Sequence, residues 1–76
     1  MELIDFVNKF AEQFEDTDVN DIQATTKFKE LDEWSSLLAL SIIAMVDEEY
    51  GITIKGEDIR LSTTVEDLFN AVKAKA

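Results

Sequence analysis

Apolar residues recur every three or four positions at both ends of the chain, which is the spacing of an amphipathic helix. Near the N-terminus this pattern predicts a helix from about Glu2 to Phe14. Its inward face is predicted to consist of Leu3, Phe6, Val7, Phe10 and Phe14. Near the C-terminus a helix is expected to begin at a capping box, in which Thr63 and Glu66 bond each other's backbone amides. Its buried stripe is predicted to be Val65, Leu68, Phe69 and Val72.

An almost unbroken apolar run occupies the middle of the chain. A serine doublet precedes it and Gly51 follows it, so it predicts a helix that begins at Ser35 or Ser36 and ends at Tyr50. The predicted inward face is Ala39, Ile42, Ile43, Val46 and Tyr50. The remaining positions form two further stripes, Leu37, Leu40 and Ala44 on one and Leu38, Ser41 and Met45 on the other. Either several elements surround this helix, or part of its surface is left for a partner.

The segments between these helices have weaker patterns. Residues 15–35 lack helical periodicity and predict a long loop held by apolar anchors. The anchors are predicted to be Val19, Ile22, Phe28 and Leu31. After an extended link at residues 52–54, residues 57–61 predict one helical turn anchored by Ile59 and Leu61. No internal repeat is present, and residues 1–76 are expected to form a single domain.

The composition favours a soluble globular protein, since 46% of the residues are apolar and 32% are charged. No segment reaches the roughly 18 consecutive apolar residues of a membrane span. The first residues lack the basic start of a signal peptide, so we expect a cytoplasmic location. We also expect a monomer.

Charge and residue usage narrow the function. The net charge of −10 repels nucleic acid and anionic membranes and attracts basic protein surfaces, although it also serves solubility alone. The chain has no Cys and no His, which excludes thiolate zinc sites and Ser–His or Cys–His catalysis. We therefore predict that the protein is not an enzyme, and that any thiol chemistry comes from an attached group.

A calcium loop is the one metal site that the sequence suggests, because Asp16, Asp18 and Asn20 alternate in the long connection. An EF-hand loop requires Gly at its sixth position and a bidentate Glu at its twelfth. These positions hold Asp21 and Lys27, so we expect no metal site.

The serine doublet at the start of the middle helix is the best candidate for chemistry. A helix N-terminus offers unpaired amides and a partial positive charge, which suit a phosphate ester on a hydroxyl such as that of Ser36. A serine is also a common N-cap, but only one of the two can fill that position.

The opposite end of the same helix carries Asp47, Glu48 and Glu49. Acids there face the negative end of the helix dipole and are disfavoured by about 0.3–1 kcal/mol each. Either these acids recognise basic partner surfaces, or they only solvate an already acidic chain.

Several of these motifs together resemble the acyl carrier proteins. They are Ser36-Leu37, the helix end at residues 47–54, Glu57-Asp58 and residues 63–68. The resemblance implies an all-α four-helix bundle with three longer helices, a short third helix and a long loop between helices one and two. It also implies that a dedicated transferase attaches a 4′-phosphopantetheine arm from coenzyme A to Ser36. The thiol of the arm would carry acyl groups as thioesters between acyl-transferring and condensing enzymes.

The sequence departs from the family at the attachment motif, where the usual Asp-Ser-Leu reads Ser35-Ser36-Leu37. Leu38 and Ser41 also occupy positions where fatty-acid carriers usually have acids, so we expect partners with a less basic and more apolar docking face. The predicted docking residues are Leu37, Asp47, Glu48 and Glu49. A sheltered acyl chain would lie among candidates that also serve as plain core: Ile43, Val46, Ile54, Ile59, Leu61 and Leu68. The alternatives are a peptidyl or aminoacyl carrier and an acidic protein-binding adaptor without a prosthetic group.

Overall fold

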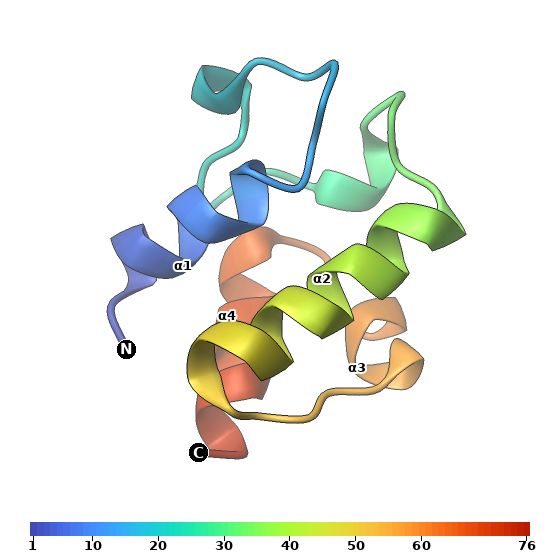
Figure 1. Cartoon of the computed structure of the whole chain (residues 1–76). Coiled ribbons are helices and arrows are strands. Elements are labelled where there is room, and N and C mark those ends of the chain that lie inside the picture. Colours follow the sequence, from blue (N-terminus) through green and yellow to red (C-terminus); the bar gives the residue numbers. More distant parts are fainter.

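The computed structural model describes all 76 residues and contains only helices, turns and irregular segments (Figure 1). The elements are α1 (Leu3–Ala11), η1 (Val19–Asp21), η2 (Phe28–Glu30), α2 (Ser36–Tyr50), α3 (Gly56–Arg60) and α4 (Val65–Ala74). The two η elements are 3₁₀ turns within the long connection between α1 and α2. The all-α four-helix fold, with a short third helix and a long first loop, is thus confirmed. No helix is both long and apolar enough to cross a bilayer.

Helix α1 ends at Ala11 and not at Phe14 as predicted. The backbone amide of Gln13 donates to the carbonyl of Phe10 at 3.2 Å, and that of Phe14 donates to Ala11 at 3.1 Å. These bonds span three residues, so the chain tightens into a 3₁₀ turn. Phe14 is buried nonetheless, which is why the apolar pattern runs past the end of the helix.

Helix α2 has the bounds that the sequence predicts. Ser35 is its N-cap, and Gly51 follows Tyr50 in the left-handed conformation with φ of 66°. The amide of Gly51 donates to the carbonyl of Asp47 at 2.9 Å. Glycine adopts positive φ without the steric cost of a side chain, so this position ends the helix.

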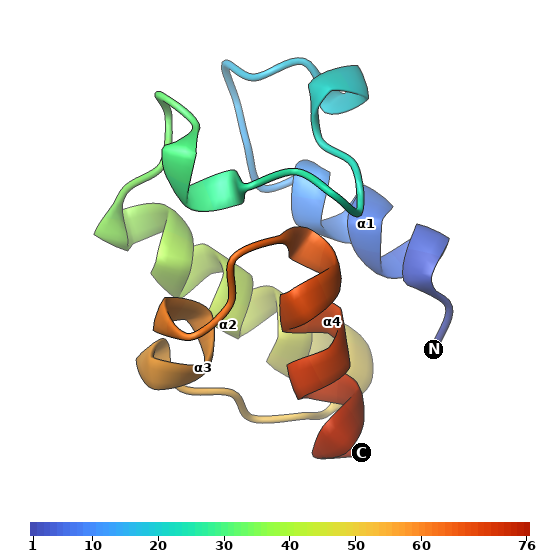
Figure 2. The ribbon, with the colours of Figure 1, turned by 180° about the vertical axis from the view of Figure 1, so that it is seen from behind.

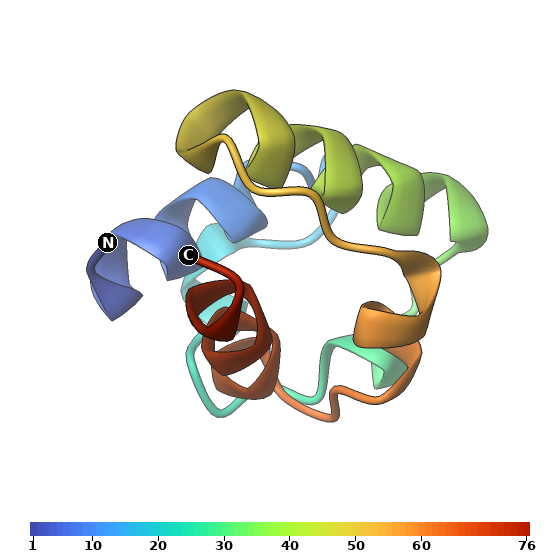
Figure 3. The ribbon, with the colours of Figure 1, turned by 90° about the horizontal axis from the view of Figure 1, so that it is seen from below.

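The burial of α2 differs in part from the prediction. Ile42 and Val46 are fully buried as expected, and the other predicted inward residues are partly buried. Leu38 and Met45, which lie on one of the two further stripes, are also buried, and this agrees with the alternative that several elements surround the helix. The reason is that α2 is covered on two sides, by α1 and by α3 (Figure 3).

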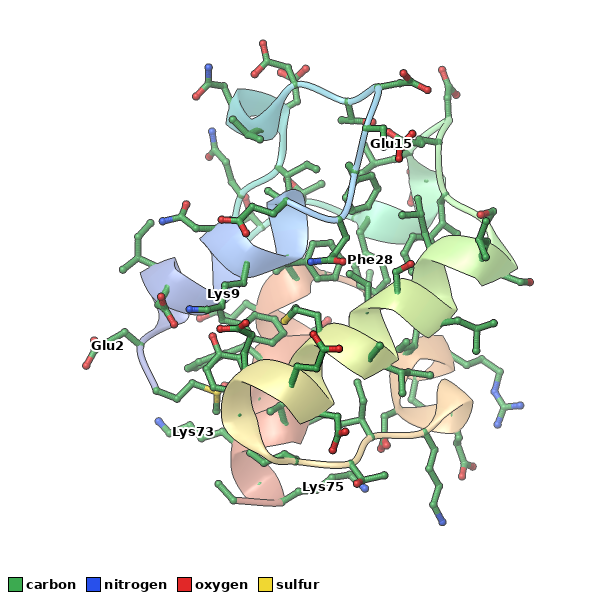
Figure 4. The ribbon with its side chains drawn as sticks, viewed as in Figure 1. Glu2, Lys9, Glu15, Phe28, Lys73 and Lys75 are labelled. Atoms are coloured by element: carbon green, nitrogen blue, oxygen red, sulfur yellow. The ribbon has the colours of Figure 1, made fainter.

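A chain of aromatic rings connects α1 to the start of α2. The rings of Phe10 and Phe28 are 5.2 Å apart, and those of Phe28 and Trp34 are 4.9 Å apart, both edge to face. Phe28 lies at the centre of the molecule and is fully buried (Figure 4). Such pairs contribute about 0.5–1.5 kcal/mol each beyond the area they bury. Because Trp34 directly precedes Ser35, these rings fix where α2 begins.

The anchors predicted for the long connection are only partly correct. Ile22 and Phe28 are buried and Leu31 packs against the core, but Val19 is 56% exposed. The connection is also held by backbone bonds to the start of α4. Here the amides of Val65 and Glu66 donate to the carbonyls of Thr26 and Ala24 at 3.2 and 2.9 Å.

Helix α3 is held by one apolar anchor and not by two. Ile59 is buried, whereas Leu61 is 74% exposed, so the prediction that Leu61 anchors this turn is wrong. Leu61 lies just after the helix, and the residue that turns inward is Ser62. Its hydroxyl donates to the carbonyl of Asp58 at 2.8 Å, which satisfies the buried polar group.

The capping box of α4 is one residue later than predicted. The pair is Thr64 and Asp67, with Thr64 Oγ1 accepting from the amide of Asp67 and the carboxylate accepting from the amide of Thr64. The amide of Thr63 donates to the same carboxylate. These bonds hold the pKa of Asp67 below its ordinary value. The predicted buried stripe of this helix is confirmed.

Candidate functional site

The two serines at the start of α2 have different environments. Ser35 is extended, with φ of −157°, and its hydroxyl oxygen accepts a hydrogen bond from the amide of Leu38 at 3.3 Å. Ser36 is the first helical residue; its side chain is exposed and makes no hydrogen bond within the chain. Ser35 is therefore the cap, and the hydroxyl of Ser36 is free to react.

The backbone around Ser36 suits a negatively charged substituent. The amides of Leu38 and Ala39 donate to the side chain and the carbonyl of Ser35, respectively. The amides of Ser36 and Leu37 have no acceptor within the chain. Unpaired amides at the positive end of a helix dipole stabilise a phosphate. The residues present thus fit a phosphodiester on Ser36.

Glu33 fixes the loop that precedes this helix. Its carboxylate accepts from the amides of Glu15 and Asp16 at 2.7 and 3.0 Å and from the hydroxyl of Thr17 at 2.8 Å. The labelled Glu15 marks this loop in Figure 4. The bond from the backbone of Glu15 is the largest cause that lowers the pKa of Glu33. Sequence reasoning missed Glu33, because one acid in an acidic loop gives no local signal of contacts 16 to 18 residues away.

An exposed apolar stripe runs along α2 from its N-terminal end. Leu37 is 73% exposed, as a docking residue requires, and Leu40 is 63% exposed on the same stripe. Ala44 is exposed one turn further on. Leu38, by contrast, is buried, so the expectation that Leu38 makes this surface more apolar is wrong. It is Leu40 that makes this surface more apolar. In the sequence, only its three-residue spacing from Leu37 indicates that Leu40 lies on the exposed stripe.

The three acids at the end of α2 differ in whether they form an ion pair within the chain. Asp47 and Glu48 are exposed and form no ion pair. Glu49 is 3.4 Å from the ammonium of Lys9, which extends from α1 toward this end of α2 (Figure 4). The ten-position separation between Leu37 and Asp47 corresponds to about 15 Å of helix. One face of α2 therefore presents apolar side chains near Ser36 and free carboxylates at the far end.

A polar cluster joins the end of α2 to α1. Lys9 also pairs with Asp5 at 3.2 Å, and the Tyr50 hydroxyl donates to Asp5 at 2.9 Å. Burial raises the pKa of Tyr50 to about 12, and the bond to Asp5 contributes. The same bond is the main cause that lowers the pKa of Asp5. Glu49 is thus engaged within the molecule, unlike its two neighbours.

The residues predicted to shelter an acyl chain do not line a cavity in this structure. Four of them are buried core residues: Val46, Ile54, Ile59 and Leu68. Ile43 is half-buried, and Leu61 lies on the surface. The hollows of the structure lie elsewhere, beside α1, along the long connection and at the start of α2. Entry of an acyl chain between α2 and α3 therefore requires these core side chains to separate, and their role as its lining stays a prediction.

Fold and site together define a small helical bundle that presents a free hydroxyl at the N-terminus of its longest helix. Comparison with protein families matches residues 5–72 to the family described as phosphopantetheine attachment site. The chain belongs to this family, whose members are carrier domains that bind 4′-phosphopantetheine covalently and are generally not catalytic themselves. No curated protein and no solved structure matches the chain.

Proposed function

We propose that Ser36 is the residue that carries the arm, and that the protein is an acyl carrier protein. The observation that supports this assignment most directly is the exposed Ser36 hydroxyl beside two amides without acceptors. Ser35, the other hydroxyl at this end, is already engaged as the cap. The thiol of the bound arm would hold acyl intermediates as thioesters.

The chain's own residues then have separate tasks. The amides of Ser36 and Leu37 stabilise the negative charge of the phosphodiester. The Ser35 cap and the rings behind Trp34 hold the start of α2 in place. Leu37 and Leu40 offer apolar contact to a docking enzyme, while Asp47 and Glu48 attract basic side chains. Glu49 acts mainly through its pair with Lys9.

The proposed partners are a phosphopantetheinyl transferase and acyl-transferring or condensing enzymes. Ser35 performs the capping task that the family's usual Asp performs, so what this chain lacks is the negative charge and not the local structure. Together with exposed Leu37 and Leu40, this favours docking faces that are apolar near Ser36. Such a face favours the enzymes of specialised, polyketide-like acyl synthesis over those of fatty-acid synthesis, which are the other candidate partners.

Two other functions define the alternatives. A peptidyl or aminoacyl carrier would use the same serine and the same helix with a different cargo. An acidic adaptor without a prosthetic group would use α2 only as a binding surface. The family match and the free hydroxyl favour a carrier over the adaptor.

Intact mass measured after incubation with coenzyme A and a broad-specificity transferase tests the assignment. The wild type should gain one arm, Ser36→Ala should gain none, and the matched variant Ser35→Ala should still gain one at completion. If Ser36→Ala gains the arm, or if Ser35→Ala alone loses it, the assignment to Ser36 is wrong. A wild type that stays unmodified by several transferases would favour the adaptor.

A further inference from the structure

A second apolar surface lies between α1 and η1, outside the proposed site. It is a shallow groove in which six of the nine lining residues are apolar: Leu3, Ile4, Val7, Val19, Ile22 and Ala24. The other three carry uncharged side-chain amides. In a chain in which 32% of the residues are charged, a groove without a single charged lining residue is unusual.

The groove has a buried floor and an exposed apolar rim. Val7 and Ile22 are buried beneath it, whereas Ile4 is 68% and Val19 is 56% exposed. Neither Ile4 nor Val19 belongs to the core or to the partly buried residues packed against it. Contiguous apolar side chains left in water typically mark an interaction surface.

The groove and the start of α2 lie on opposite sides of the molecule. Figures 1 and 2 both place α1 and η1 at one edge and the beginning of α2 at the other edge, and Figure 3 agrees for α1. A partner in the groove therefore leaves Ser36 and the exposed stripe of α2 accessible. Occupancy of the groove should not depend on the arm.

The charge near the groove indicates which kind of partner could bind there. Glu2 is exposed, precedes the lining residue Leu3 in the chain and extends from this edge in Figure 4. Asp18 and Asp21 are also exposed; they flank Val19 and Asn20 in the chain and line the neighbouring hollow of the long connection. These nearby acids, on a chain of net charge −10, repel a second copy and an anionic membrane. They attract a segment whose apolar face is bordered by Lys or Arg, and an amphipathic helix lays that kind of face into a groove.

We propose that the groove between α1 and η1 is a docking site for a basic amphipathic helix of a partner protein, independent of the arm on Ser36. The site allows the carrier to be held in an assembly while its arm serves the enzymes that dock on α2. This inference goes beyond the proposed function, since it concerns a different surface and a different kind of partner.

The proposal is tested with a synthetic helical peptide that has a leucine face bordered by lysines, and with the same peptide bordered by glutamates. Binding to the ¹⁵N-labelled full chain is followed by NMR titration. The lysine peptide should shift amides of α1 and residues 19–24, equally in the wild type and in Ser36→Ala. Ile4→Glu and Val19→Glu, both at exposed positions, should each weaken binding by about tenfold or more.

Leu40→Glu is the matched control, because it makes the same charge change at an exposed leucine of α2. Binding that survives Leu40→Glu and is lost in Ile4→Glu supports the proposal. Shifts confined to α2, equal binding of the glutamate peptide, or self-association of the free chain in sedimentation each overturn it. Circular dichroism of each variant shows whether the fold is retained, and the Ser36 assignment is measured separately by arm addition.

Discussion

Replacing Ser35 separates the capping role of this residue from the charge that the family usually places there. In Ser35→Ala the amide of Leu38 loses its acceptor, and loss of an N-cap costs about 0.5–2 kcal/mol. The bond is long, at 3.3 Å, so we expect a value near 1 kcal/mol at most. For a domain of this size that corresponds to a fall in Tm of about 4–8 °C.

Ser35→Asp retains the cap and adds a carboxylate at the positive end of the helix dipole. It should be as stable as the wild type or gain about 0.3–1 kcal/mol at low salt. Urea or thermal unfolding followed by circular dichroism measures both variants. The rate of arm addition, followed by intact mass, then separates the two roles of the position.

If local structure limits arm addition, Ser35→Ala is slowed and Ser35→Asp matches the wild type. If the missing charge limits it, Ser35→Asp is faster than the wild type. Ser36→Ala serves as the control, since this side chain makes no hydrogen bond within the chain and its loss should change stability by less than about 0.5 kcal/mol. The reasoning is refuted if Ser35→Ala unfolds like the wild type while Ser36→Ala is clearly destabilised.

Three further predictions concern docking, the core and pH. Leu37→Ala should slow transfer to partner enzymes with little change in Tm, because the side chain is 73% exposed; an equal loss of both would place Leu37 in the core. Phe28→Ala should cost about 3–5 kcal/mol in urea unfolding, since the ring is fully buried, and a cost under about 1 kcal/mol would contradict its central place. Folding lowers the pKa of Glu33 and of Asp67 below their unfolded values of 4.5 and 3.8. The ionised carboxylates therefore stabilise the folded state above those pH values, and this stabilisation is lost as the pH falls through the folded pKa values. In Glu33→Gln, Tm should therefore fall less steeply than in the wild type as the pH is lowered into the acid range. An equally steep fall would show that Glu33 does not contribute to the acid sensitivity of the fold.

The sequence predicts best the elements that local chemistry determines. The bounds of α2 follow from a serine cap and a glycine that alone reaches positive φ, and both signals are adjacent to the helix. The start of α4 is harder to predict, because Thr63 and Thr64 are each followed three residues later by an acid and either could form the capping box. The backbone geometry, which the residue types do not encode, selects the second pair.

Burial and long-range contacts are predicted less well. Val19 and Leu61 have the residue type of an anchor but lie on short turns that direct them to solvent. The sequence leaves open whether Leu38 is buried, because the periodicity of one helix does not show that neighbours cover it on two sides. At the candidate site, the free Ser36 hydroxyl agrees with expectation, whereas the bonds of Glu33 and the pair between Glu49 and Lys9 depend on tertiary contacts.

Helix α2 has no basic residue, and its apolar and acidic parts are segregated along its length. The consequence is kinetic. In the docking proposed above, long-range attraction from the carboxylate end would accelerate the first encounter with a cationic enzyme, while the lifetime of the complex would depend on the leucines beside Ser36. Raising ionic strength should therefore slow arrival far more than it shortens residence. A carrier that must visit many enzymes in turn gains from this division, because rapid capture does not entail slow release.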